Sequence, residues 1–274
     1  MAAMRAGLFI LAMSGCVSIP PYQGTTTQDA SPDGATSPLA ARMIGNAYRN
    51  GAGAGTSGMS ATGFTVPTTG IVDGDLVLFI ANVDNGADNF WNLPAGFQVL
   101  ANRHNGMDGQ SYVFGYKIAA GEPTLYTGTY GSSSTSAAAT VSLVAVTGYD
   151  PVVPINVSLP WDYPDDADPA NLSTPGVTTT VDNTLLIYAA GVDWHGENGQ
   201  NTYVAPDGFT MITTLGDEVT KWQWTSQMIA SKVQPTKGAT GQIVDTTLGV
   251  KSDDMMVHIP GAGWTVLVAI APAH

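Results

Sequence analysis

The amino-acid sequence predicts an all-β fold, an antiparallel two-sheet β-sandwich of the jelly-roll or concanavalin-like kind that follows an extended N-terminal arm. Segments with the apolar pattern of strands recur roughly every 8–12 residues, a spacing typical of sandwiches. The 32 glycines and 17 prolines separate these segments as turn residues. No stretch combines helical periodicity with a capping box, so we expect little helix.

The first 40 residues are predicted to form the arm or linker. Residues 17–40 are rich in Pro, Thr, Ser and Gly and show no periodicity. Before them, a short apolar run at residues 6–13 leads to Ser-Gly-Cys16, which resembles a bacterial lipoprotein signal. Two interpretations stay open, an uncleaved arm and a signal peptide processed at Cys16. The run is too short to span a bilayer, so no membrane span is expected.

The sandwich domain is predicted to span residues 41–274. Its most apolar strand is "DLVLFIANVD" at residues 75–84. Small residues fill "TSAAATVSLVAVTG" at residues 135–148, which predicts a central strand with closely packed neighbours. The segment "SYVFGYKIA" at residues 111–119 alternates as strands do, and one of its faces carries Tyr112, Phe114, Tyr116 and Ile118.

The same motifs occur twice in the same order, which predicts a sandwich built from two related halves. In the first half, "DLVLFIANVD", "LPAGFQVL" and "SLVAVTG" correspond to "TLLIYAAGVD", "APDGFTMI" and "TVLVAIAP" of the second. The halves are predicted at about residues 41–159 and 171–272, joined by the acidic, proline-broken loop "PWDYPDDADPA" at residues 160–170. We expect them to cover each other's edge strands in one sandwich, and two tandem sandwiches stay an open alternative.

Each half also contains a Pro-x-Gly-Phe turn. Proline restricts φ at the start of the turn, and a type II turn needs a positive φ at its third residue, which is Gly96 or Gly208 here. We expect the aromatic residues that follow, Phe97 and Phe209, to be core anchors.

Composition excludes several classes of function. A net charge of −13 with only nine Lys plus Arg argues against binding to nucleic acid and to anionic membranes. The single cysteine, Cys16, excludes a disulfide within the chain. No nucleophile elbow, zinc-binding helix motif or phosphate loop occurs in the sequence. We therefore expect no enzyme activity, no cofactor, no catalytic residues and no metal site.

Two weak candidates for ligand binding remain. If the strand continued through "VDWHGENG", then Asp193, His195 and Glu197 would project to one side as a metal or acid–base cluster. A polar loop after a buried strand explains the same residues. Trp91 and Trp194 follow equivalent strands, so they are predicted on one rim, where their rings would stack on sugars. Large aromatic residues also serve as core or interface anchors.

Together these segments resemble a known family. The ordered series "VDGDLVLFIANVD", "LPAGFQVL", "YKIAAGEPT", "VAVTGYDPVVPI", "VTTTVDNTLLIYAAGVD" and "GWTVLVAIAP" resembles a β-sandwich module of tailed-bacteriophage structural proteins. That module occurs in tail-fibre, minor-tail and head-decoration proteins. The resemblance covers about residues 42–272 and brings no catalytic residues with it. It implies a virion protein that assembles with other capsid or tail proteins and forms a homo-oligomer.

The chain departs from that family in its lipoprotein-like start and in having no fibrous shaft. Two alternatives therefore accompany the virion hypothesis. One is a host-surface glycan-binding module, and the other is a bacterial surface lipoprotein with the same sandwich. The position in the virion is left open by the sequence.

Overall fold

The computed structural model describes one compact unit within Thr36–His274. The described residues are 37–49, 56–60, 62–83, 91–105, 110–130, 138–163, 172–193, 200–215, 225–244, 248–251 and 263–274. All regular structure in them is β-strand, which confirms the predicted all-β class. Most of the predicted arm, residues 1–36, lies outside the described residues. Leu39 already packs against the core and Ala40 begins a strand, so the folded unit starts slightly before the predicted boundary.

The first large sheet has the strand order β2-β1-β9-β4-β7-β6, with antiparallel neighbours throughout. The central strand expected from the small residues is confirmed, because β9 lies between β1 and β4 and is buried except at Thr147. The strands are β1 (Ala40–Arg49), β2 (Thr56–Ser57), β4 (Leu76–Val83), β6 (Gln98–Asn105), β7 (Gln110–Ile118) and β9 (Ala139–Thr147).

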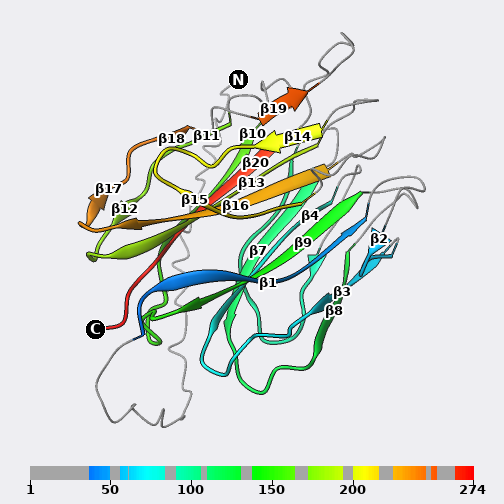
Figure 1. The fold of residues 1–274 in the computed structure, drawn as a ribbon, viewed down its shortest axis with the longest axis horizontal. Coiled ribbons are helices and arrows are strands. Elements are labelled where there is room, and N and C mark those ends of the chain that lie inside the picture. Colours follow the sequence, from blue (N-terminus) through cyan, green and yellow to red (C-terminus); the bar gives the residue numbers. More distant parts are fainter. Residues whose placement is uncertain are drawn as a thin grey trace, which may run out of the picture. The chain divides into compact units, whose positions relative to one another are not determined.

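The second large sheet has the order β10-β20-β13-β16-β15 (Figure 1). Leaving out the two-residue β2, both sheets place their strands in the order first, fifth, second, fourth and third along the chain. The two sheets are thus built alike, whereas common descent of the halves and a jelly-roll topology stay predictions. The strands are β10 (Ile155–Tyr163), β13 (Thr184–Asp193), β15 (Thr210–Leu215), β16 (Thr225–Gln234) and β20 (Gly263–Ile270).

The structure corrects the position of the predicted connection between the halves. Residues 160–163 belong to β10, which pairs with β20 in the second sheet, and residues 164–170 lie outside the described part. The chain instead passes from one sheet to the other at residues 148–154. Pro160 is tolerated in a strand here because β10 is at the edge of its sheet and pairs on one side only, so that a residue without a backbone N–H can be accommodated.

Smaller strand groups cover the outer faces of both large sheets. The first sheet is covered by a three-stranded sheet of order β3-β8-β5, and the second by three short pairs, β11-β18, β12-β17 and β14-β19. These elements are β3 (Gly63–Pro67), β5 (Trp91–Asn92), β8 (Leu125–Tyr130), β11 (Ser173–Thr174), β12 (Thr178–Thr179), β14 (Gln200–Tyr203), β17 (Gly238–Ala239), β18 (Ile243–Val244) and β19 (Leu248–Lys251).

The two large sheets face each other across a central hydrophobic cluster, and each has a second cluster on its outer face. Strand β4 shows the consequence, because Leu78 points into the central cluster while its neighbours Val77 and Phe79 point into the outer one. Burial of both faces explains the continuous apolar sequence of this strand. The central cluster includes Leu76, Leu78, Ile80, Tyr112, Phe114, Val144, Leu185, Ile187, Trp264, Val266 and Val268.

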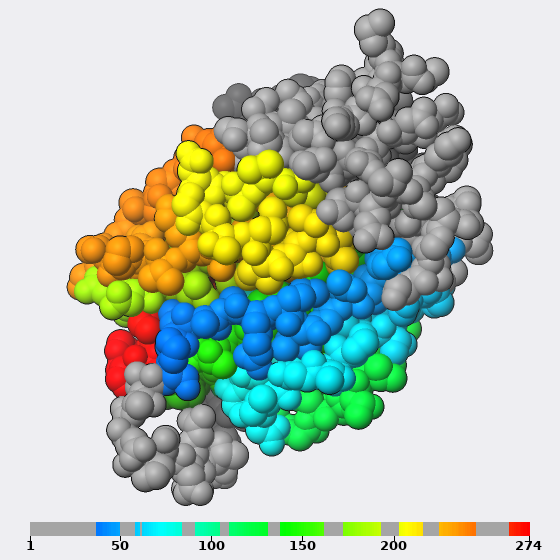
Figure 2. All heavy atoms as spheres, viewed as in Figure 1, coloured from blue at the N-terminus to red at the C-terminus, as the bar shows by residue number. Residues whose placement is uncertain are grey.

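The contacts between the sheets follow an approximate two-fold pattern. Strand β1 lies against β15 and β6 lies against β10, while β9 lies against β16 and β7 against β20. Exchanging the two sheets would reproduce these four pairs, as in an interface between two similar subunits, whereas the further contact of β4 with β16 has no counterpart of similar extent between β13 and β7. Figure 2 shows one of these pairs, β1 in blue beside the yellow residues of β15.

The Pro-x-Gly-Phe turns have the predicted backbone. The φ angles of Gly96 and Gly208 are +89° and +77°. In the second turn, the carbonyl of Pro206 accepts a 2.8 Å hydrogen bond from the N–H of Phe209, so the glycine is the third residue of the turn.

The two aromatic residues of these turns are half-buried rather than fully buried. Phe97 and Phe209 pack against the outer clusters of the first and second sheet. A lysine covers each ring, with Lys117 Nζ 5.7 Å from the Phe97 centroid and Lys232 Nζ 5.6 Å from that of Phe209. The methylene stems of both lysines cover the apolar rings, and the ammonium group of Lys117 also pairs with Glu122.

A second turn is also shared by the two sheets. Asp73 accepts a 2.7 Å hydrogen bond from the N–H of Gly121, and Asp182 accepts one of 2.7 Å from the N–H of Lys237. In both turns the residue directly after the aspartate has a left-handed backbone, with φ of +89° at Gly74 and +56° at Asn183.

All four strands at the long edges of the large sheets carry a register shift. Such bulges twist an edge and interrupt the row of free backbone groups that would otherwise pair with another chain. The edges of the described unit are therefore poor templates for strand addition. The shifts lie between Met43 and Gly45, Val99 and Ala101, Ile155 and Val157, and Met211 and Thr213.

Gly96→Val is expected to lower the free energy of unfolding by more than about 1 kcal/mol, because a β-branched residue is strained at this positive φ. The nearest neighbour of an added Cβ would be Lys117 Nζ at 3.6 Å, so the cost comes from the backbone and not from a clash. Gly96→Asn is the control, since Asn tolerates left-handed φ. Urea denaturation measures both, and an unchanged stability of Gly96→Val would contradict the turn assignment.

Candidate functional site

A buried polar layer joins the two large sheets at one end of the central cluster. The Asn82 amide of β4 donates hydrogen bonds to Thr225 Oγ1 (2.7 Å) and to the carbonyl oxygen of Ser226 (3.2 Å) on β16. The hydroxyl of Thr140 donates to the Asn82 side-chain oxygen. All these side chains are fully buried, so the bonds replace lost hydration and fix how the sheets meet.

A second bond crosses the same layer. The Gln227 amide of β16 donates to Ser142 Oγ of β9 at 2.6 Å. Gln110 Nε2 also reaches Thr225 Oγ1, at 3.4 Å. Because the layer consists of neutral amides and hydroxyls, it provides orientation between the sheets rather than an acid, a base or a nucleophile with an activating partner.

An aromatic stack lies beside this layer. The rings of Tyr112 on β7 and Trp264 on β20 are 4.9 Å apart and inclined by only 11°. The indole lies over Gly191 of β13, where an added Cβ would come within 2.5 Å of Trp264 Nε1. A side chain at position 191 would overlap the indole of Trp264, so the packing requires glycine there. Sequence reasoning missed it, and its only signal was a glycine inside an otherwise apolar strand.

Several carboxylates of the described unit hold turns in place. Asp75 is almost fully buried, pairs with Arg42 at 2.5 Å and accepts a 2.8 Å hydrogen bond from the N–H of Val72. Beside it, the hydroxyl of Tyr149 donates to the Gly74 carbonyl at 2.7 Å. Burial, together with the negative Asp75, raises the pKa of Tyr149 to about 12. This cluster ties the turn at residues 71–75 to the connection between the sheets.

Glu122 is engaged in a similar way. Its carboxylate pairs with Lys117 Nζ at 2.8 Å and accepts hydrogen bonds from the Tyr126 hydroxyl and, at 3.0 Å, from the N–H of Ala120. Burial opposes the ionisation of Glu122, but these bonds and the positive lysine outweigh it, so its pKa lies below the ordinary value. Burial and the same carboxylate raise the pKa of Tyr126. The group is a partly buried ion pair beside the first outer cluster.

The structure places one of the four sequence-predicted site residues in the core. Trp91 was expected on an exposed rim, but it is almost fully buried and contacts the rings of Phe64, Phe79 and Tyr130. The reason is that β5 pairs with β8 of the covering sheet, which directs the indole inward. Its ring therefore offers no free face to a sugar.

The other predicted site residues cannot be assembled into a site. Asp193 is the last residue of β13, but its side chain lies outside the described part. Trp194 and His195 lie outside it altogether. The predicted metal or acid–base cluster consequently stays a prediction.

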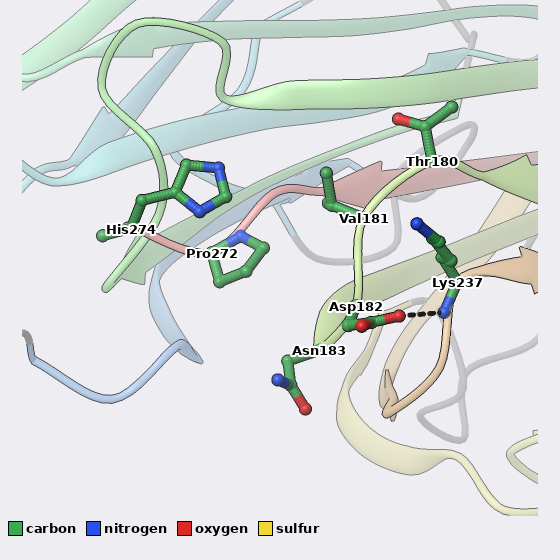
Figure 3. A pocket seen from close by; sticks show the side chains of 8 residues that line it. Thr180, Val181, Asp182, Asn183, Lys237, Pro272 and His274 are labelled. Atoms are coloured by element: carbon green, nitrogen blue, oxygen red, sulfur yellow. Dashed lines mark hydrogen bonds between the residues drawn. The ribbon is translucent and has the colours of Figure 1, made fainter.

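A shallow depression of about 410 Å³ lies at the opposite end of the second sheet. Figure 3 shows its side chains spread around it, with His274 and Lys237 on opposite sides. The Asp182 carboxylate in it is already used by the Lys237 N–H. Within the described residues, no group of three or more His, Cys, Asp or Glu is placed to hold a metal ion. The depression is lined by Thr180, Val181, Asp182, Asn183, Lys237, Pro272, Ala273 and His274.

A search of the described residues finds no helix with the length and apolar character needed to cross a membrane. No protein-family model, no curated protein and no solved structure matches the chain.

Gly191→Ala is expected to destabilise the protein by about 1–3 kcal/mol, because the new methyl group overlaps the Trp264 indole. In a Trp264→Leu background the same substitution should cost much less, since the overlap is gone. A double-mutant cycle by urea denaturation measures this coupling, expected at roughly 0.5–3 kcal/mol. Additive effects would show that the indole does not determine the need for glycine.

Glu122→Gln is expected to lower stability at neutral pH and to have a smaller effect in acid. The pKa of Glu122 is lower in the folded than in the unfolded chain, so the stabilisation is present above pH 4.5 and is lost as the pH falls below it. Unfolding free energies of both proteins between pH 7 and pH 3 test this. Asp207→Asn, at an exposed turn carboxylate, is the control. A difference between wild type and Glu122→Gln that does not change with pH would contradict it.

Proposed function

We propose that this chain is a non-enzymatic structural protein of a tailed-bacteriophage particle, a capsid-decoration or tail component that acts by protein–protein assembly. The resemblance of its ordered strand and turn motifs to the phage sandwich module motivates the proposal. The virion is then its location, and other virion proteins and further copies of the chain are its partners.

The proposal that the protein is not an enzyme rests on the structural contacts that its carboxylates make. Each of five carboxylates accepts hydrogen bonds from backbone N–H groups, and two of the five also pair with a cation. They hold turns and strands together and do not converge on a cleft, so they are poorly suited to acid–base work. The five are Asp73, Asp75, Glu122, Asp150 and Asp182.

The assembly part is supported by the architecture of the unit. Both large sheets are buried on both faces, and their edges are interrupted by bulges. Such a unit does not need to change shape on binding and does not extend by strand pairing. It is suited to joining an assembly as a preformed block that contacts its neighbours through turns.

The two alternatives stay separable from this proposal. For a glycan-binding module, Trp91 is no longer a candidate, whereas Trp161 on the edge strand β10 is 42% exposed. Loss of glycan-array binding in Trp161→Ala would favour that module. For a surface lipoprotein, mass spectrometry of the native N-terminus decides, because an intact Met1 is incompatible with lipidation at Cys16.

The test of the proposal is mass spectrometry of purified particles, in which the full chain should be present at a fixed ratio to the major capsid or tail protein. A variant lacking residues 1–35 should keep the melting temperature of the described unit and yet be lost from particles. The deletion stops at residue 35 because residues 37–39 pack on the folded unit. Absence of the full chain from particles would refute the proposed function, and normal incorporation of the deletion would show that residues 1–35 are not needed for assembly.

A further inference from the structure

We propose that one end of the described unit, here called the base, is an apolar docking surface for a different protein subunit of the assembly. The base consists of the turns at residues 71–75 and 148–154 together with residues 37–39 and 271–274. The inference rests on the proposed function and identifies the surface of the unit that faces the particle.

Both ends of the folded chain meet at the base. The backbone of residues 37–39 lies directly on Gly148, where an added Cβ would come within 2.2 Å of the Ser37 carbonyl oxygen. The hydroxyl of Thr147 donates to the Pro38 carbonyl at 3.2 Å. On the other side, the N–H of Ala273 donates to the carbonyl of Gly148 at 2.8 Å. Figures 1 and 2 show the blue start of β1 and the red C-terminal residues at the same end.

The turn beside these ends exposes apolar side chains. Val152 is 85% exposed and Val153 is 55% exposed, whereas many other valines of the described unit are buried in its core. The turn is fixed, because Asp150 Oδ1 accepts hydrogen bonds from the N–H groups of Val152 (2.8 Å) and Val153 (3.2 Å). Exposed apolar side chains on a fixed backbone lose little entropy on binding, which favours a docking role.

The second turn of the base has the same character. Val72 is 62% exposed, and its N–H is held by the buried Asp75. The hydrogen bond between Tyr149 and Gly74 ties this turn to the one that carries Val152 and Val153. The base therefore presents its three valines from two connected turns.

The chemistry of the base favours a protein partner. Arg42 and Asp75 pair beside the first turn, and His274 lies 3.8 Å from Asp150 beside the second, so polar and charged groups surround the valines. An apolar centre with a mixed polar rim is typical of protein interfaces. A net charge of −13 disfavours an anionic lipid surface.

The chain enters the described unit beside the exposed valines. Residues 1–36 precede Ser37, and Ser37 lies beside Gly148, four residues before Val152. A subunit that binds residues 1–36 would therefore be tethered next to the exposed valines. Tethering raises its effective concentration at the base, so a small apolar contact is enough to orient the unit.

Cysteine labelling of the full chain in a Cys16→Ser background tests the position of the base. Val152→Cys should react with a maleimide in the free protein and be protected at least about tenfold in particles. Val244→Cys is the matched control, because Val244 is 41% exposed on β18, away from the base. Labelling of Val152→Cys in particles, or equal protection of both positions, would overturn the proposal.

A second variant tests the contribution of the surface to assembly. Val152→Asp with Val153→Asp should reduce occupancy in particles at least about tenfold at limiting protein, because two buried valines are lost from the contact. Val244→Asp should leave occupancy unchanged. If wild type and the double variant are incorporated equally, only the docking surface fails. If wild type is not incorporated, the proposed function itself fails.

Two other occupants are distinguished in solution with the full chain. Size-exclusion chromatography with light scattering would reveal a dimer that the double variant loses, which would assign the base to a second copy. Flotation with phosphatidylcholine vesicles would reveal a lipid surface in the same way. Either result would overturn the assignment to a different subunit.

Discussion

Burial of both faces of two β-sheets is the constraint on which the rest of the described unit depends. Each fully buried Leu, Ile or Val side chain contributes about 1.5–3 kcal/mol relative to exposure, and the central strands bury them on both sides. A sheet that is apolar on both faces requires cover on both. The other large sheet supplies it on one side and the short strands on the other, which gives four layers rather than the two of a simple sandwich.

The central contact combines similarity with difference. The two sheets have one strand order and meet in an approximate two-fold pattern, yet their side chains at matching places differ. Gly191 and Asn82 occupy matching positions on β13 and β4: the first makes room for Trp264, and the second binds across to β16. Two copies of the same half would therefore not reproduce this interface. The differences make each half specific for the other.

Strand type and alternation were predictable from the sequence because they depend on local pattern. The alternation of β7 is confirmed, with Tyr112 and Phe114 in the central cluster and Val113 in the outer one. Positive φ at Gly96 and Gly208 followed from the turn motif alone. In contrast, Pro160 and its acidic neighbours favoured a loop, and only their position in an edge strand explains why they form part of β10.

Side-chain environments that depend on distant pairing were not predictable. Trp91 follows a core strand closely in sequence, and its burial is decided by pairing with Tyr130 about forty residues later. The polar layer around Asn82 combines residues from both sheets, so no local sequence motif predicts it. Asp193, Trp194 and His195 remain predictions, because their side chains lie outside the described part.

In the described part, the chain passes from one large sheet to the other at residues 148–154, which has a consequence for biosynthesis. Since all strand pairing of the first sheet is complete by Thr147, that half is able to fold while the second is still being translated. Until the second half is translated, the first half exposes the apolar face that later forms part of the central cluster. The second half of a neighbouring chain carries the same complementary face. We therefore expect refolding at rising protein concentration to yield dimers in which the halves are exchanged between two chains. If no such dimers form, the two halves of one chain associate faster than halves of different chains.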